Sequence, residues 1–279
     1  MDCCYLSPKT LHEAMRYEAC VIALGFFDGV HLAHQRLLQE AKRAAETRHL
    51  PLAVITFSPH PKALLAPEEF AGGYITPFWI KKAVLEQNGV NRMYVIPFDK
   101  PFSSLSPDAF VNQYLLPLNP KAVVAGYDFR YGKSGAGDVA SLAERMRGIA
   151  EVIRFDKMME GSDKISSTMI RKLILSGRVE MVKAYLGRDY AIEGKLDVSF
   201  SKGRRRFAVS ESYVIPCAGL YHVQVFDETS SFSASCVVDE NQNLQFRNQG
   251  LPIADGRQVT VRFLRKITGT LMNRAASSE

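Results

Sequence analysis

Two histidines, His31 and His34, stand at the start of a predicted helix, directly after a turn that contains glycine. The apolar run at residues 20–24 before the turn predicts a buried strand, and the segment after it has leucine and alanine at helical spacing. Gly25 and Gly29 allow the turn a close backbone approach or a positive φ. The two imidazoles can share one face of the first helical turn, whose free N–H groups form a natural anion site.

Three interpretations of these histidines are open. A metal pair would need further ligands, and His-x-x-His alone is a weak sign of zinc. Two packing residues would have no chemical role. Phosphate donors fit both the glycine turn and the helix start, which the other interpretations leave unused. The pattern therefore favours phosphate binding.

Two further predicted strands end in loops with notable side chains. Residues 52–57 run into Pro59 and Pro61, which stop the strand and stiffen the following loop. Residues 122–125 run into a glycine-containing loop that combines a carboxylate, an arginine and aromatic rings, with Asp128, Phe129 and Tyr131 of interest. A rigid strand end and an ordinary polar loop are the alternatives.

Hydroxyl residues open another predicted helix. Ser166, Ser167 and Thr168 precede an apolar helical face, and such residues commonly cap helices. Capping and phosphate binding are compatible, because a helix N-terminus serves both. Arg171, one turn in, can add a charge-assisted contact.

The elements that must position these residues alternate between strand and helix. The other elements expected there are a helix within residues 1–18, which contain Leu11, Ala14 and Met15; a helix over 76–88 closed by Gly89; a strand over 93–97; a helix capped by Ser106 with Pro107 at its first position; and a helix over 177–186 that ends at Gly187. The alternation predicts an α/β fold with a parallel sheet. Ligands bind at the carboxyl ends of such strands, so one crevice could collect the notable loops.

The pattern changes over residues 188–279. Helical periodicity ceases, and apolar residues alternate with polar ones over residues 221–226, 232–238 and 259–263. Turn signals of glycine, asparagine and aspartate separate these runs. We expect a six- or seven-stranded antiparallel sheet or small barrel.

The composition predicts a cytoplasmic globular protein. The chain has 279 residues, which suggests two domains, and no apolar run approaches the ~20 residues of a membrane helix. The first residues lack a secretory pattern, and the five cysteines lack Cys-x-x-Cys spacing. The net charge of +6 suits small anionic substrates and a weak attraction to nucleic acid equally, so it does not choose between them. The basic cluster at residues 202–206 is expected to be a solvated loop or hairpin end, with a polyanion contact as the alternative.

Four segments resemble the adenylyltransferase module of the bacterial bifunctional riboflavin kinase/FAD synthetase family. The string Gly-Phe-Phe-Asp-Gly-Val-His-Leu-Ala-His at residues 25–34 is similar to the family's version of the nucleotidyltransferase His-x-Gly-His signature. Ala33 stands where the family usually has glycine; it adds a methyl group and removes no hydrogen-bonding group. The other matching segments are residues 56–61, 126–132 and 165–171.

The resemblance implies a Rossmann-like nucleotidyltransferase domain over residues 1–187 and a degenerate riboflavin-kinase-like β-barrel over residues 188–279. It implies that the substrates FMN and ATP give FAD and pyrophosphate. It implies no membrane or nucleic-acid partner, and it implies Mg²⁺ that is bound mainly through the phosphates of ATP. The implied ATP-binding residues are Gly25, Phe26, Phe27, Gly29, His31, His34, Ser167 and Arg171, and the implied catalytic residues are His31, His34, Ser167, Thr168 and Arg171. The implied FMN-binding residues are Pro59, Pro61, Asp128, Phe129 and Tyr131, with the tyrosine ring able to stack on the flavin.

The kinase chemistry of the family is not visible. Its Gly-x-Pro-Thr-Ala-Asn segment has no counterpart after Gly203, where three arginines follow instead. Arginine contacts phosphate but neither ligates magnesium nor accepts a proton. The nearby acids Asp227, Glu228, Asp239 and Glu240 are expected to be solvated. We therefore predict no riboflavin kinase activity. A non-catalytic flavin- or nucleotide-binding regulator and another adenylyl- or cytidylyltransferase stay open as alternatives.

Overall fold

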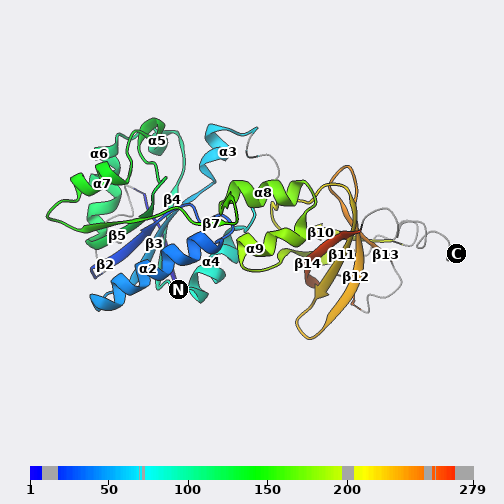
Figure 1. The fold of residues 1–279 in the computed structure, drawn as a ribbon. Helices are drawn as coiled ribbons and strands as arrows, with labels where there is room; N and C mark the ends of the chain where they lie inside the picture. The colour runs from blue at the N-terminus through cyan, green and yellow to red at the C-terminus, as the bar shows by residue number, and fades with distance from the viewer. Residues whose placement is uncertain are drawn as a thin grey trace. The chain divides into compact units, whose positions relative to one another are not determined.

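The structure is a computed structural model that describes residues 1–7, 18–68, 70, 73–196, 204–247, 253–254 and 256–267. Figure 1 shows the fold, in which the chain divides into two compact units. The first unit holds Met1–Ala71 and Phe78–Met159, and the second holds Gly72–Pro77 and Glu160–Glu279. The domain bounds that the resemblance implies, 1–187 and 188–279, stay a prediction.

The first unit is built on a six-stranded parallel sheet with the order β1-β4-β3-β2-β5-β6. The strands are β1 (Asp2–Tyr5), β2 (Cys20–Leu24), β3 (Leu52–Ser58), β4 (Arg92–Pro97), β5 (Pro120–Gly126) and β6 (Glu151–Phe155). The helices are α2 (Leu32–Thr47), α3 (Pro61–Leu65), α4 (Phe78–Gln87), α5 (Lys100–Ser103), α6 (Pro107–Phe110), η1 (Val111–Leu115), η2 (Leu116–Leu118), η3 (Lys133–Gly135) and α7 (Val139–Arg145). This is the expected Rossmann-like arrangement.

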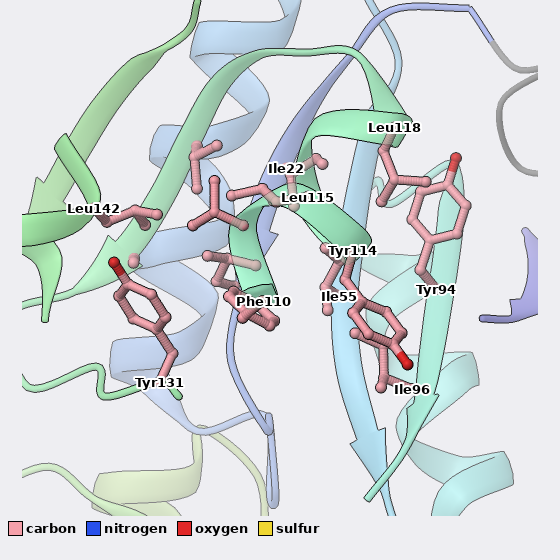
Figure 2. Packing of buried hydrophobic residues seen from close by; sticks show 14 of the residues in the cluster. Ile22, Ile55, Tyr94, Ile96, Phe110, Tyr114, Leu115, Leu118, Tyr131 and Leu142 are labelled. Atoms are coloured by element: carbon pink, nitrogen blue, oxygen red, sulfur yellow. The ribbon is translucent and has the colours of Figure 1, made fainter. Parts of the chain in front are cut away.

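Side chains of the central strands alternate between two apolar clusters, one on each face of the sheet. Ala23 belongs to the cluster that includes Leu38 of α2. Ile22, the preceding residue, belongs to the cluster that includes Phe110 of α6, which Figure 2 shows. Because both faces are covered, the strands are near-continuous apolar runs, which is why they were recognisable in the sequence.

The second unit contains a closed antiparallel barrel of six strands in the order β10-β13-β12-β11-β14-β9. The strands are β9 (Tyr190–Leu196), β10 (Arg204–Val209), β11 (Gly219–Phe226), β12 (Ser231–Val238), β13 (Leu244–Arg247) and β14 (Gln258–Ile267). Between β6 and the barrel, the chain forms β7 (Met159–Glu160), β8 (Asp163–Lys164), α8 (Ser167–Leu175), η4 (Val179–Met181) and α9 (Val182–Leu186). Alternate residues of β11 are buried, so the predicted barrel is confirmed.

Several predicted helix ends are confirmed by their backbone geometry. The Ser106 hydroxyl caps α6 by accepting the N–H of Ala109 at 3.1 Å. Gly89 and Gly187 have φ values of 84° and 79°, the left-handed conformation that ends a helix. Among the described residues, none of the helices combines the length and the apolar character needed to span a bilayer.

One expectation about local structure is wrong, and another falls outside the described residues. Residues 2–5 form strand β1 beside β4, because pairing with a strand distant in sequence decides their conformation. Leu11, Ala14 and Met15, on which the helix expected within residues 1–18 rests, lie outside the described residues. The arginines of the basic cluster belong to β10, which pairs with both β13 and β9, instead of a solvated loop. Arg205 is only 4% exposed, while residues 202 and 203 lie outside the described residues.

Candidate active site

The turn after β2, residues 25–31, is strained; we name it the histidine turn. Phe27 and Val30 have φ values of 59° and 43°. Residues other than glycine rarely adopt such backbone conformations, and β-branched residues such as valine do so least of all. Gly29 has a φ of 86°. Gly25 provides close approach instead, because a Cβ there would lie 3.0 Å from the Phe27 ring. Strain of this kind is kept where surrounding contacts enforce it, and it concentrates at functional sites.

His31 is both a helix cap and an oriented hydrogen-bond donor. As N-cap of α2, its Nδ1 accepts the backbone N–H of His34 at 3.2 Å. A ring nitrogen that accepts a hydrogen bond carries no proton, so the neutral ring carries its proton on Nε2. The side chain is 5% exposed. The cap therefore fixes the tautomer that a phosphate-binding imidazole needs.

His34 is held neutral in the same turn of helix. Its ring stacks on His31 with centroids 3.6 Å apart and planes at 10°, and it meets Phe27 edge-on at 5.1 Å. Burial, His31 and Lys81, in that order, hold the pKa of His34 well below its usual range. Its Nδ1 is buried without a hydrogen-bond partner in the described part of the chain. A buried polar atom of this kind is costly until something binds to it.

Lys81 is a candidate that the sequence reasoning missed. It lies on α4, is 3% exposed, and donates from Nζ to the Phe26 carbonyl at 3.2 Å and to the Thr56 hydroxyl at 3.1 Å. Burial lowers the pKa of Lys81 to about 8, although Asp28 acts in the opposite direction. The signal lay in the helical pattern: Lys81 shares the buried face of α4 with Leu85, four residues on. A lysine at a core position is unusual and indicates a function.

An apolar pocket of about 440 Å³ opens in the first unit. Its wall is rich in aromatic rings, and two cations also line it; these residues are Phe57, Phe98, Phe102, Phe110, Tyr131, Arg130 and Lys133. We name it the aromatic pocket. Ligand sites in proteins are mostly apolar with a few placed polar groups, and this lining suits a flat ring system that carries an anionic group.

The aromatic pocket includes part of the predicted flavin set. Pro61 and Tyr131 line it, whereas Pro59, Asp128 and Phe129 are not among its lining residues. The Tyr131 ring packs so closely on Gly137 that a Cβ there would lie 2.5 Å from the ring. The phenylalanines of the wall were missed by the sequence reasoning, although Phe98 and Phe102 closely follow a predicted strand.

The histidine turn and the aromatic pocket lie at one edge of one sheet. From β2 the chain adds β3 and β4 on one side, and it then adds β5 and β6 on the other side of β2. The direction in which successive strands are added to the sheet therefore reverses between the neighbouring strands β2 and β5. The carboxyl end of β2 leads into the histidine turn, and that of β5 leads toward Tyr131. Ligands bind outside the carboxyl ends of the strands at such a switch point. The topology thus brings the histidine turn and the aromatic pocket to the same edge.

The second unit carries the hydroxyl-rich helix start. The Ser166 hydroxyl caps α8 by accepting an N–H of the first turn at 3.3 Å, so capping is confirmed. Ser167 is half-buried and Thr168 is exposed. Arg171 donates from Nη1 to the Gly73 carbonyl at 2.6 Å, which holds the guanidinium one turn from the helix N-terminus. Both the helix end and the arginine favour an anion.

Fold and site together define the class of the protein: a nucleotidyltransferase with a Rossmann-like domain and an antiparallel barrel in the same chain. The chain belongs to the FAD synthetase family, whose model matches residues 13–169. A bifunctional riboflavin kinase/FMN adenylyltransferase of Listeria monocytogenes is 42% identical over 73% of this chain and 67% of that protein. The corresponding protein of Bacillus subtilis is 37% identical over 77% of this chain and 70% of its own length.

Two further relatives are informative. A protein of Listeria monocytogenes named FAD synthetase is 31% identical over 77% of this chain and 85% of that protein. The crystal structure of a Streptococcus pneumoniae protein described as a macrolide-efflux protein has 25% sequence identity and a TM-score of 0.87, covering 99% of this chain and 97% of that one. A fold similar to that of this chain over nearly its whole length is therefore found in a solved structure.

Proposed function

We propose that this chain is an FMN adenylyltransferase, which makes FAD and pyrophosphate from FMN and ATP. A phosphate oxygen of FMN attacks the α-phosphorus of ATP. The new P–O bond forms as the bond from the α-phosphorus to the bridging oxygen breaks, and pyrophosphate leaves with that oxygen. A phosphate monoester is largely dianionic near pH 7, so no strong protein base is needed. Catalysis then depends on positioning and on charge neutralisation.

The observation that carries this proposal is the meeting of two kinds of site at one sheet edge. At the end of the histidine turn His31 presents an Nε2–H donor, and His34 in the first turn of α2 is neutral, which suits contact with phosphate oxygens without a proton transfer. In the aromatic pocket, aromatic rings suit the isoalloxazine, and Arg130 and Lys133 add positive charge for an anionic substrate. A site for a nucleotide alone would have little use for the second feature.

The other predicted residues have defined tasks in this proposal. The backbone of the histidine turn, at Gly25, Phe26, Phe27 and Gly29, approaches ATP closely. Ser167, Thr168 and Arg171 bind the β- and γ-phosphates and the leaving pyrophosphate. On the flavin side, Pro59 and Pro61 stiffen the border of the pocket, while Asp128, Phe129 and Tyr131 place FMN.

We propose that Mg²⁺ arrives on the phosphates of ATP. No group of three or more histidine, cysteine, aspartate or glutamate side chains suited to a metal ion occurs among the described residues. The side chains of the described residues therefore fit a metal that keeps phosphate and water as most of its ligands and needs few ligands from the protein. When bound, the metal neutralises phosphate charge. We place the reaction in the cytoplasm, since all five cysteines are free thiols.

We further propose that the barrel does not phosphorylate riboflavin. Asp227 and Asp239 each accept backbone N–H groups of their own turns, which hold their carboxyl pKa values below the usual range. A general base for a hydroxyl needs a pKa nearer the working pH. Arg205 and Arg206 lie in β10, where the kinase motif of the family would follow Gly203. The relative named only as FAD synthetase supports this assignment.

The experiment uses the full chain with ATP and Mg²⁺ and either FMN or riboflavin, and the flavins are separated by chromatography. We expect FAD from FMN and no FMN from riboflavin. Bound flavin without turnover would instead indicate a regulator. FMN formed from riboflavin would overturn the proposal that the barrel lacks kinase activity. The variant Glu193→Gln would show whether the barrel forms this FMN, because burial raises the pKa of Glu193 on β9, as a general base requires.

A further inference from the structure

Lys81 is a buried cation that has no negative partner at bonding distance within the part of the chain that the structure describes. Both of its hydrogen bonds among the described residues go to neutral oxygens, of Phe26 and of Thr56. Its Nζ also lies 4.4 Å from the centroid of the Phe26 ring, a weaker cationic contact. An ammonium has three N–H donors, so one remains unused in the described part of the chain. Burying a charge without full compensation is costly.

A purely structural role for Lys81 is already filled by another residue. The Phe26 carbonyl, which Lys81 contacts at the histidine turn, also accepts the hydroxyl of Thr56 at 2.9 Å. The turn would therefore keep a partner for this carbonyl if the lysine were absent. The hydrogen bonds of Lys81 to the described residues thus do not account for the cost of burying its ammonium group.

The surroundings of Lys81 match those of a phosphate ligand. Its two acceptors stand at the carboxyl ends of β2 and β3, the edge where a parallel sheet binds ligands. Lys81 is close enough to His34 to lower the pKa of that ring, whose Nδ1 is buried and unpartnered. The buried carboxyl of Asp28 is the acidic group that acts on Lys81. An unused donor and an unpartnered ring nitrogen therefore lie in one neighbourhood.

We propose that Lys81 is a catalytic residue that binds a phosphate oxygen of ATP or of FMN through its third N–H. The inference rests on the proposed function, and it adds a cation to the histidine pair. Bound phosphate would place a negative charge at bonding distance of the ammonium, closer than the effect of Asp28 requires. Neutralisation by a fixed cation in a dry site stabilises developing charge more strongly than it does in water.

A consequence of this contact is that substrate binding takes up protons. With a pKa of about 8, part of the free protein has a neutral Lys81 at pH 8. A phosphate beside the amine raises that pKa, so binding draws protons from the buffer. Calorimetry at pH 8 in buffers with different ionisation enthalpies measures this uptake, with MgATP alone in one arm and FMN alone in the other. The arm that shows uptake identifies the substrate whose phosphate Lys81 binds.

Three variants test the assignment. Lys81→Met removes the charge, Lys81→Arg keeps a charge that does not titrate, and Lys82→Met is the matched control, a half-buried neighbour on the same helix. We expect kcat/KM for FAD formation to fall about 10²-fold or more in Lys81→Met, as for other preorganised donors, with partial rescue in Lys81→Arg. Proton uptake should vanish in both and persist in Lys82→Met.

The outcomes separate this inference from the proposed function. Wild-type kcat/KM in Lys81→Met, or proton uptake in wild-type protein that Lys81→Arg leaves unchanged, would overturn the role of Lys81. If Lys81→Met fails to fold, the comparison of proton uptake between the wild type and Lys81→Arg still tests the role of Lys81. Absence of FAD formation by the wild type would instead refute the adenylyltransferase proposal, while the binding arms still test Lys81.

Discussion

Replacing His31 by asparagine or by alanine separates its two roles. Asparagine keeps a side-chain oxygen that caps α2, whereas alanine removes the cap, which is worth about 1 kcal/mol. Both variants lose the stack on His34, which contributes ~0.5–1.5 kcal/mol beyond area burial. The free energy of unfolding should therefore fall in both, and by about 1 kcal/mol more in His31→Ala.

The activity of the two variants should fall together. Both lose the Nε2–H donor of His31, and losing one preorganised donor raises the activation barrier by ~2.7–4 kcal/mol, a loss of ~10²–10³ in kcat. A difference in stability without a difference in activity is the signature of two independent roles. The capping bond at 3.2 Å accounts for the first loss, and the Nε2–H that it leaves on the ring accounts for the second.

The assays are urea denaturation followed by circular dichroism and steady-state formation of FAD from FMN. His49→Asn is the matched control, because His49 is an exposed histidine near the other end of α2 and its φ of 53° suits asparagine. Wild-type kcat in His31→Asn would refute the phosphate role of His31. A greater loss of stability in His31→Asn than in His31→Ala would refute the capping role.

Three other predictions concern the remaining parts of the site. Arg171→Ala should raise KM for ATP about tenfold, or ~1.4 kcal/mol, and leave flavin affinity unchanged; fluorescence titration that shows lost FMN affinity with unaltered ATP kinetics would contradict this. Because the folded pKa of His34 is depressed, unfolded protein binds more protons, so the free energy of unfolding should decrease as pH falls below about 6.5, by at most ~1.4 kcal/mol per pH unit. Urea midpoints at pH 7.5 and 5.5 measure this, and an equal decrease in His34→Gln would exclude His34 as the cause. Gly137→Ala should displace Tyr131 and weaken FMN binding about tenfold, whereas unchanged FMN affinity would show that the ring does not shape the pocket.

Features that depend on neighbours in sequence were predictable. The histidine turn, the caps at Ser106 and Ser166 and the glycine ends of helices all follow from local chemistry. The two-face burial of the sheet explains why its strands read as apolar runs, and the alternation of β11 explains why the barrel was recognised. The conformation of each of these features depends on residues that are close to one another in the sequence.

Features that depend on distant pairing were not predictable. β1 exists because residues 2–5 pair with β4, about ninety positions away in the chain. Lys81 reaches partners 25 and 55 positions away, and Arg171 reaches a carbonyl 98 positions away. Arg205 is buried because its segment completes the barrel between two strands. No local pattern encodes such contacts, although a lysine on the apolar face of a helix does mark one of them.

The measurement that tests the central claim most directly follows the phosphorus of ATP into the flavin. The full chain is incubated with Mg²⁺, FMN and ATP labelled at either the α- or the γ-phosphorus, and FAD is isolated. Adenylyl transfer predicts that FAD carries the α-label and none of the γ-label, and that pyrophosphate forms in equal amount. Failure to form FAD, or γ-label in the flavin, would contradict the account.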